Sequence, residues 1–141
     1  MKTTKQILPG VKFIGWVYAH KLIPDITLRG IARMPVPIFT DIHEVQFFDD
    51  PKCECVTTND NGHHLDTVTL KFASEDVIPT EVNIALIVTD IDGHSYIIGS
   101  RDSPYTVIKR TISLGVRDGD AAGVEYEITH KAIKSLIPCD I

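Results

Sequence analysis

Side chains that bind zinc are concentrated in one short stretch of the chain. Residues 53–64, CECVTTNDNGHH, contain two of the three cysteines and two of the six histidines. Thiolates and imidazoles are preferred zinc ligands, and a structural site places about four of them around one point. Cys-x-Cys followed by His-His is not a standard spacing for such a site. The stretch is therefore either an unusual metal site or a β-hairpin that carries these residues for another reason.

The pair Asn61-Gly62 predicts how the stretch folds, because these two residues favour the type I′ turn of a two-residue hairpin loop. Such a turn sets the register of the strands on either side of it. The predicted cross-strand pairs are Asp60 with His63, Cys55 with Val68, and Cys53 with Leu70.

This register keeps the thiols away from the imidazoles. Cys55 lies five residues along the ladder from the row of His63, or roughly 17 Å at ~3.4 Å per residue. A four-residue loop over 59–62 shortens the separation to about 10 Å, which is still too long for a shared ion. His63 and His64 are adjacent and point to opposite faces of a strand. We expect both to lie near the turn, exposed to solvent.

The cysteines have a simpler explanation. Cys53 and Cys55 share one face of a strand, opposite Val68, Leu70 and Phe72, whereas the other face is largely polar. Reduced cysteine is a small apolar side chain that is often buried. We predict that both are core residues. An intrachain metal site, redox chemistry and chemistry between subunits are the alternatives.

Other chemical motifs are weaker. Asp90-Ile91-Asp92-Gly93 and Asp118-Gly119-Asp120 resemble fragments of calcium loops, but they lack the longer ladder and the twelfth-position Glu of an EF-hand. Turns explain both better. The sequence contains no G-x-S-x-G elbow, phosphate-binding glycine loop or H-E-x-x-H helix. We therefore assign no catalytic, cofactor-binding or metal-binding residue and no cofactor. The remaining histidines, His20, His43, His94 and His130, are scattered.

Composition narrows the range of partners. The 141 residues carry a net charge of −5 with 14 Lys+Arg, which is not the basic footprint that nucleic acids require. No run approaches the length of about 18 apolar residues expected of a membrane span. Lys12, Gly15 and His20 interrupt any signal-peptide core. We expect a cytoplasmic protein with reduced thiols, without nucleic-acid or membrane partners.

The elements that must position these residues are mostly strands, since short β-branched and aromatic runs alternate with turn residues. We predict a single all-β domain over residues 1–141, a mainly antiparallel sandwich or barrel with at most one or two short helices. Prolines over Ile23–Pro37 indicate an irregular connection or edge segment, Gly115–Gly123 is a flexible loop, and His130–Ile137 is the one candidate helix, ended by Pro138. The predicted strands are Val11–Tyr18, Val36–Thr40, Glu44–Phe48, Cys53–Thr58, Leu65–Ala73, Asn83–Asp90, Ser95–Ser100, Tyr105–Ile112 and Val124–Thr129.

A second hairpin is predicted at Asp92-Gly93, again from the preference of this pair for a two-residue turn. One face of the ribbon would carry Leu86, Val88 and Ile97, and the other Ala85, Ile87, Tyr96 and Ile98. Both faces are apolar, so we expect burial on both sides by other layers of the fold or by another subunit. The predicted pairs are Ile91 with His94, Thr89 with Tyr96, Val88 with Ile97, and Ile87 with Ile98.

Residues 66–139 resemble small uncharacterised proteins encoded among bacterial prophage structural genes. The similarity is carried by the turn Asp92-Gly93, the block 98–105 (IGSRDSPY) and the ending 134–139 (KSLIPC). None of these pieces is a catalytic motif, and no functional residue is transferred by the resemblance. It implies a virion- or tail-associated genomic setting.

Three functional hypotheses follow. The first is a non-catalytic structural or assembly protein, such as a phage tail or head–tail component, whose partners are copies of itself or other virion proteins. It would use sheet edges and the loop Gly115–Gly123. The second is a β-barrel or sandwich that binds a ligand or carbohydrate, with Trp16 and Tyr105 in a pocket. The third, and the least supported, is an enzyme assembled from scattered His and Asp residues.

Overall fold

The computed structural model describes residues 2–8, 10–74, 76, 78–101, 105–113 and 123–140. Within these residues the chain forms strands together with one short α-helix and one 3-10 turn, which confirms the all-β prediction. The elements are β1 (Lys2–Ile7), β2 (Val11–Tyr18), η1 (Ala19–Lys21), α1 (Ile26–Ile31), β3 (Val36–Pro37), β4 (His43–Val45), β5 (Phe47–Asp60), β6 (His63–Ser74), β7 (Ile84–Asp90), β8 (Ser95–Ile98), β9 (Val107–Ser113), β10 (Gly123–Ala132) and β11 (Ile137–Asp140).

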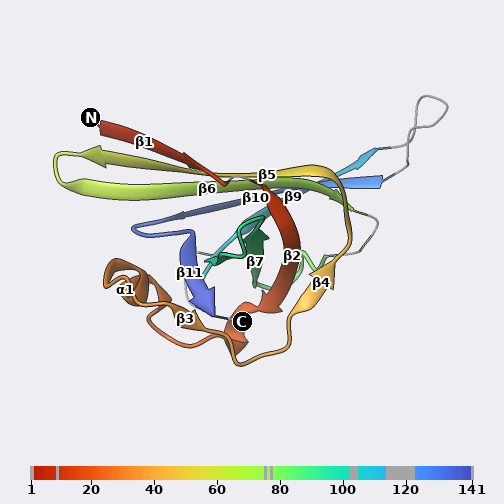
Figure 1. Ribbon diagram of the computed structural model, residues 1–141, viewed down its shortest axis with the longest axis horizontal. Helices are drawn as coiled ribbons and strands as arrows, with labels where there is room; N and C mark the ends of the chain where they lie inside the picture. Colours follow the sequence, from red (N-terminus) through yellow and green to blue (C-terminus); the bar gives the residue numbers. More distant parts are fainter. Residues whose placement is uncertain are drawn as a thin grey trace.

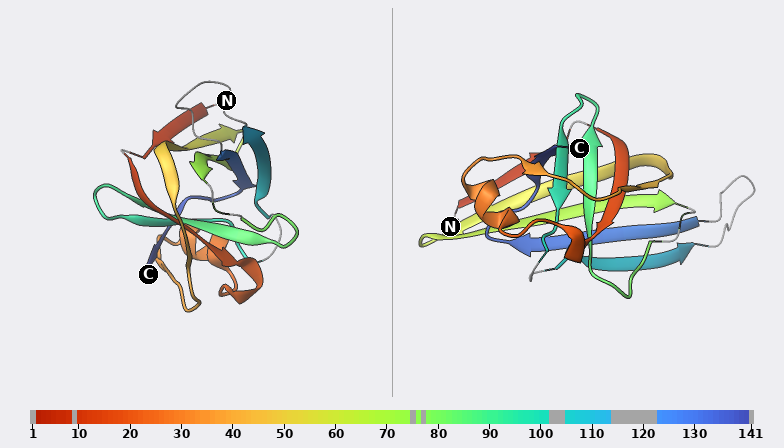
Figure 2. Two further views of the ribbon diagram at one scale, coloured as in Figure 1. Left: turned by 90° about the vertical axis from the view of Figure 1, so that its right-hand side faces the viewer. Right: turned by 90° about the horizontal axis from the view of Figure 1, so that it is seen from below.

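The strands form two sheets that pack face to face (Figure 1). The long sheet has the order β1-β5-β6-β10-β9, and the short sheet has the order β3-β11-β8-β7-β2-β4. Strands of the short sheet run across those of the long sheet, as seen in the right-hand view of Figure 2. The architecture is therefore a sandwich rather than a barrel, with the crossed packing that two twisted sheets adopt when their strands are not aligned.

One apolar core lies between the sheets. The long sheet contributes Cys53, Val68, Leu70 and Ile128, all buried, and the short sheet contributes side chains of β2, β7 and β8. The largest of these side chains are fully excluded from solvent, so hydrophobic burial holds the two sheets together.

A second core lies on the other face of the short sheet. Ala85 and Ile87 of β7 pack there with Leu22 and Ile26, which belong to the segment that carries α1. Every residue of β7 is buried. The prediction that this ribbon is covered on both sides is thus confirmed, and the covering layers come from the same chain.

The register of the β7–β8 hairpin differs from the prediction by one residue. Thr89 pairs with Ser95 and Val88 with Tyr96, so Tyr96 and Ile98 share the inner core with Val88, and Ile97 joins the second core. The loop spans three residues, 91–93, because Asp90 N–H bonds His94 C=O at 3.0 Å and Gly93 takes a φ of +90°. A three-residue loop that ends in a left-handed glycine is the next most common hairpin connection.

The candidate helix at His130–Ile137 is wrong. β10 continues to Ala132, and β11 begins at Ile137. Ile133 and Ile137 do not share a helical face, since Ile133 is 61% exposed and Ile137 is 2% exposed. Pairing of residues 130–132 with β6 outweighs the local helical spacing.

Two elements were not predicted. β1 is a polar, exposed strand without apolar alternation, and six residue pairs with β5 hold it in place. α1 lies inside the proline-rich segment 23–37 and packs through Ile26, and β3 does form an edge of the short sheet, as expected of that segment. Residues 115–122 of the predicted loop, with Asp118-Gly119-Asp120, lie outside the described residues, and Gly123 opens β10.

Candidate functional site

The stretch CECVTTNDNGHH is a hairpin with the predicted register. Asp60 pairs with His63, Cys55 with Val68 and Cys53 with Leu70. Asn61 and Gly62 have φ values of 51° and 83°, the two positive values that a type I′ turn requires. The turn residues alone were therefore sufficient to predict the register of this ladder.

Cys53 and Cys55 are core residues, as predicted, with exposed fractions of 2% and 4%. Burial raises the pKa of the Cys53 thiol to about 12 and that of Cys55 to about 11, to which nearby negative charges contribute. Metal ligation and nucleophilic attack require thiolates, and these groups remain protonated at neutral pH. His63 and His64 are exposed. The structure therefore does not bring these thiols and imidazoles together.

The described part of the chain contains one group of three side chains that could ligate a metal, namely Asp90, Asp92 and His94, whose ligand atoms lie within 4.8 Å of one another. Asp90 is buried, and its Oδ1 accepts bonds from the backbone N–H groups of Asp92 (3.0 Å) and His94 (2.9 Å). The second oxygen lies 3.7 Å from Nδ1 of His94. The carboxylate thus shapes the loop, in agreement with the turn interpretation of this motif.

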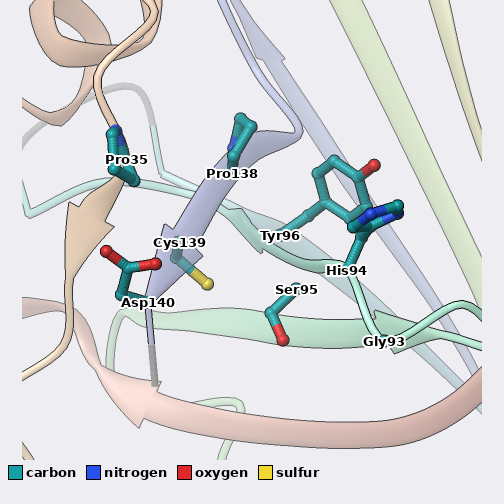
Figure 3. A pocket seen from close by; sticks show the side chains of 8 residues that line it. All are labelled: Pro35, Gly93, His94, Ser95, Tyr96, Pro138, Cys139 and Asp140. Atoms are coloured by element: carbon teal, nitrogen blue, oxygen red, sulfur yellow. The ribbon is translucent and has the colours of Figure 1, made fainter.

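A cleft of about 500 Å³ opens beside this turn (Figure 3). It lies at the end of the β8–β11 ladder, which within the described residues consists of the pairs Ile97–Ile137 and Tyr96–Pro138. Continuing this register would place Ser95 opposite Cys139. The lining residues are Pro35, Gly93, His94, Ser95, Tyr96, Pro138, Cys139 and Asp140.

The backbone groups of Ser95 point away from β7, towards β11. Because Asp90 N–H bonds His94 C=O across the β7–β8 ladder, the alternation of an antiparallel pair turns the N–H and C=O of Ser95 away from β7. Figure 3 shows the side chains of Tyr96 and Pro138 on one side of the strands and those of Ser95 and Cys139 on the other. The cleft therefore lies between two side-chain surfaces.

The polar side chains at this cleft can form hydrogen bonds with a ligand. Partial burial, with the negative charges of Asp90 and Asp92, raises the pKa of Tyr96 above its ordinary value of 10.0. The phenol is therefore a neutral donor at neutral pH. Asp140 is exposed and also lines the cleft, where its carboxylate can accept hydrogen bonds.

A second polar cluster joins residues that are far apart in the sequence. Buried Asp66 accepts bonds from the Thr57 hydroxyl (2.7 Å) and the Ser135 backbone N–H (3.0 Å), and it lies 3.1 Å from Nε2 of His64. The hydroxyl of Ser135 is hydrogen-bonded to Nδ1 of His130 at 2.6 Å. Sequence reasoning missed this cluster because no motif links its members.

The cluster resembles a nucleophile with its base, but its burial argues for structure. Ser135 is 3% exposed and His130 is 2% exposed, so no substrate carbonyl can reach the hydroxyl in this conformation. Asp66 is 2% exposed and has three donors around it. These groups tie the β10–β11 corner to the β5–β6 hairpin.

Trp16, which the ligand-binding hypothesis singled out, stacks on a histidine. Its ring lies 4.1 Å from that of His43, at an interplanar angle of 18°, and it meets Tyr18 edge-on at 5.0 Å. One face of the indole is thus covered by an imidazole from the edge strand β4. Tyr105 is 38% exposed.

The edges of the long sheet are the remaining candidate surface. Within the described residues β1 pairs with β5 alone and β9 pairs with β10 alone. Ile7 on β1 is 63% exposed and Val107 on β9 is 67% exposed. An unpaired edge with an exposed apolar side chain is a template for another strand.

No helix among the described residues is long and apolar enough to cross a membrane. Comparison with known proteins identifies no relative: no protein-family model matches the chain, and no curated protein or solved structure is similar to it.

Proposed function

We propose that the protein is a non-catalytic structural or assembly protein that acts through contacts with copies of itself or with other assembly proteins, as the resemblance to prophage-encoded proteins implies. The observation that carries the proposal is the open long sheet. Its outer strands β1 and β9 each have one unpaired edge within the described residues, with Ile7 and Val107 exposed on them.

Charge on these edges constrains the partner. β1 carries Lys5, and β9 carries Lys109 and Arg110, although the whole chain has a net charge of −5. Lysines on edge strands oppose indiscriminate pairing between like edges. A partner strand that carries acidic side chains would relieve this repulsion. Charge would then determine which strand binds, and hydrogen bonds to the unpaired backbone would stabilise the contact.

Proline substitution tests the contact without breaking the fold. Leu8 N–H bonds Cys53 C=O at 3.1 Å, so alternation along the ladder turns the N–H groups of Thr3, Lys5 and Ile7 away from β5. Thr3→Pro removes an outward donor and leaves the Lys5–Glu54 ion pair in place, whereas the control Thr4→Pro removes a donor that faces β5.

Light scattering over a wide concentration range should give a mass above 15.7 kDa for the wild type. Thr3→Pro should shift the equilibrium towards monomer without lowering the melting temperature. Thr4→Pro should lower the melting temperature instead. A wild type that stays monomeric at every concentration contradicts self-assembly.

A second candidate function is a ligand-binding module, and the cleft between β8 and β11 favours it. Its volume of about 500 Å³ and its mixture of aromatic and polar groups suit a small ligand. This cleft does not use Trp16 or Tyr105, the aromatics expected from the sequence. A screen of small molecules by NMR, with Tyr96→Ala as the control, tests it: shifts confined to residues 93–96 and 138–140 support the site, and their absence contradicts it.

A further inference from the structure

A groove of about 340 Å³ lies between α1, the start of β6 and the β10–β11 corner, on the side where the β5–β6 hairpin projects (Figure 1). Three of the side chains around it are basic and two are exposed isoleucines. Its lining residues are Gly30, Ile31, Arg33, His64, Ile133 and Lys134.

The cations of this groove are available to a ligand. Within the part of the chain that the structure describes, neither Arg33 nor Lys134 forms an ion pair, although acidic residues outnumber basic ones by 19 to 14 in the whole chain. The nearby carboxylate of Asp66 is 2% exposed and is already bonded to Thr57, Ser135 and His64. It therefore holds His64 in place more than it neutralises Arg33 and Lys134.

Backbone geometry brings both residues to the groove. A Cβ at Gly30 would lie 2.7 Å from Cδ1 of Ile137 and 3.1 Å from Cγ of Lys134, so the glycine lets the stem of Lys134 pack closely on the helix. Arg33 follows the helix with a φ of 59°, and its N–H bonds Gly30 C=O at 3.1 Å. A non-glycine residue pays roughly 1 kcal/mol or more for this conformation.

The apolar part of the groove is also exposed. Ile31 is 53% exposed and Ile133 is 61% exposed, and they come from the helix and the corner respectively. An apolar body placed between them would bury surface that is now in water.

We propose that this groove is an anion-binding site, which takes a phosphate or carboxylate group carried on an apolar body. The Arg33 guanidinium suits two oxygens of one anion, and Lys134 supplies a second charge. Ile31 and Ile133 contact the apolar body. Neither β1 nor β9 lines the groove, so ligand binding here and assembly at the sheet edges are separately testable.

The test is an NMR titration of the 15N-labelled full chain with sodium phosphate, acetate or hexanoate at constant ionic strength, with sodium chloride as the reference. Saturable shifts are expected at Gly30, Arg33, His64 and Lys134. Hexanoate should bind about tenfold more tightly than acetate if the isoleucines contact the alkyl chain. Phosphate binding with weak hexanoate binding would identify a phosphate ligand without an apolar body and would overturn that part of the proposal.

Variants separate a built site from general surface charge. The double variant Arg33→Gln/Lys134→Gln should weaken binding by more than tenfold. The matched control Arg29→Gln/Lys131→Gln, which removes two cations outside the groove lining, should leave binding unchanged. Shifts that grow linearly with anion, or that persist in the first variant, would overturn the proposal.

Discussion

Oδ2 of Asp66 accepts a hydrogen bond from the backbone N–H of Ser135, 69 positions further along the chain. Together with the pairing of β6 with β10, which extends to Ala132 opposite Asp66, this contact joins the β5–β6 hairpin to the β10–β11 corner. The corner in turn carries Lys134 and leads into Ile137, on which α1 rests. The buried carboxylate therefore links the long sheet with the outer layer of the fold.

Removal of this carboxylate should destabilise the protein strongly. Asp66→Ala leaves the buried N–H of Ser135 and the partly buried hydroxyl of Thr57 without their acceptor, and a buried unsatisfied group costs about 1–3 kcal/mol. We expect the free energy of unfolding in urea to fall by about 3 kcal/mol, with an unchanged dependence on urea concentration. Glu54→Ala, which removes a surface ion pair with Lys5, should cost about 0.5 kcal/mol or less. Equal effects of the two substitutions would contradict the linking role.

The protein should lose stability at alkaline pH because of its thiols. Burial raises the pKa of Cys53 and Cys139 to about 12 and that of Cys55 to about 11, from an ordinary value of 9.0. Above pH 9.0 the unfolded chain releases these protons while the folded chain keeps them. The unfolded state is then favoured as pH rises, by up to about 1.4 kcal/mol per pH unit for each thiol.

Urea unfolding at a series of pH values measures this loss, which should be absent below the ordinary thiol pKa and complete only near pH 11–12. Cys53→Val should reduce the slope by about one third, because one of three thiols is removed. A flat profile through this range would contradict the raised pKa values of the thiols in the folded protein.

Two glycines should respond to alanine for different reasons. A Cβ at Gly62 meets no atom within 4 Å, so Gly62→Ala costs only the left-handed conformation, about 1 kcal/mol. Gly30→Ala gains about 1 kcal/mol of helix propensity. However, its Cβ would lie 2.7 Å from the side chain of Ile137, which is 2% exposed and packed in the second core.

Overpacking of this kind costs about 1–3 kcal/mol. Gly30→Ala should therefore be net destabilising, and Gly30→Ala with Ile137→Val should recover part of the loss. Thermal unfolding by circular dichroism compares the variants. A stabilised Gly30→Ala would show that α1 does not pack tightly on β11.

The stack of Trp16 on His43 should be visible in fluorescence, because Trp16 is the one tryptophan of the chain. His43→Ala exposes one face of the indole, which should shift its emission to longer wavelength and cost about 0.5–1.5 kcal/mol of stability. His20→Ala is the matched control, since this imidazole lies beside Tyr18, 5.6 Å away. Unchanged emission in His43→Ala would contradict the stack.

Sequence reasoning succeeded where a short segment contained all the information. Asn61-Gly62 specifies a turn whose two positive φ values few other residues accept, and the turn sets the pairing of Cys53 and Cys55 without help from distant residues. At Asp92-Gly93 the same reasoning predicted a strand register that is wrong by one residue. There the buried carboxylate of Asp90 accepts hydrogen bonds from two backbone N–H groups and favours a three-residue loop.

Elements whose stability comes from distant contacts were missed. β1 has no apolar alternation and depends on the edge of β5, and α1 has no capping side-chain bond and depends on the second core. In the segment 130–137 the local spacing favours a helix. Pairing with β6 and burial of Ile137 make it a strand, a corner and a second strand.

The sequence by itself determined the all-β class, the cysteine hairpin and the two-sided burial of β7, because periodicity and turn chemistry act between near neighbours. The tertiary structure alone decided which charged residues meet. Arg33, His64 and Lys134 share a groove, and Asp66 meets Ser135, because the packing of α1 and of the β10–β11 corner brings distant segments together. Side-chain chemistry is local, but a site is made by long-range contacts that no spacing along the chain encodes.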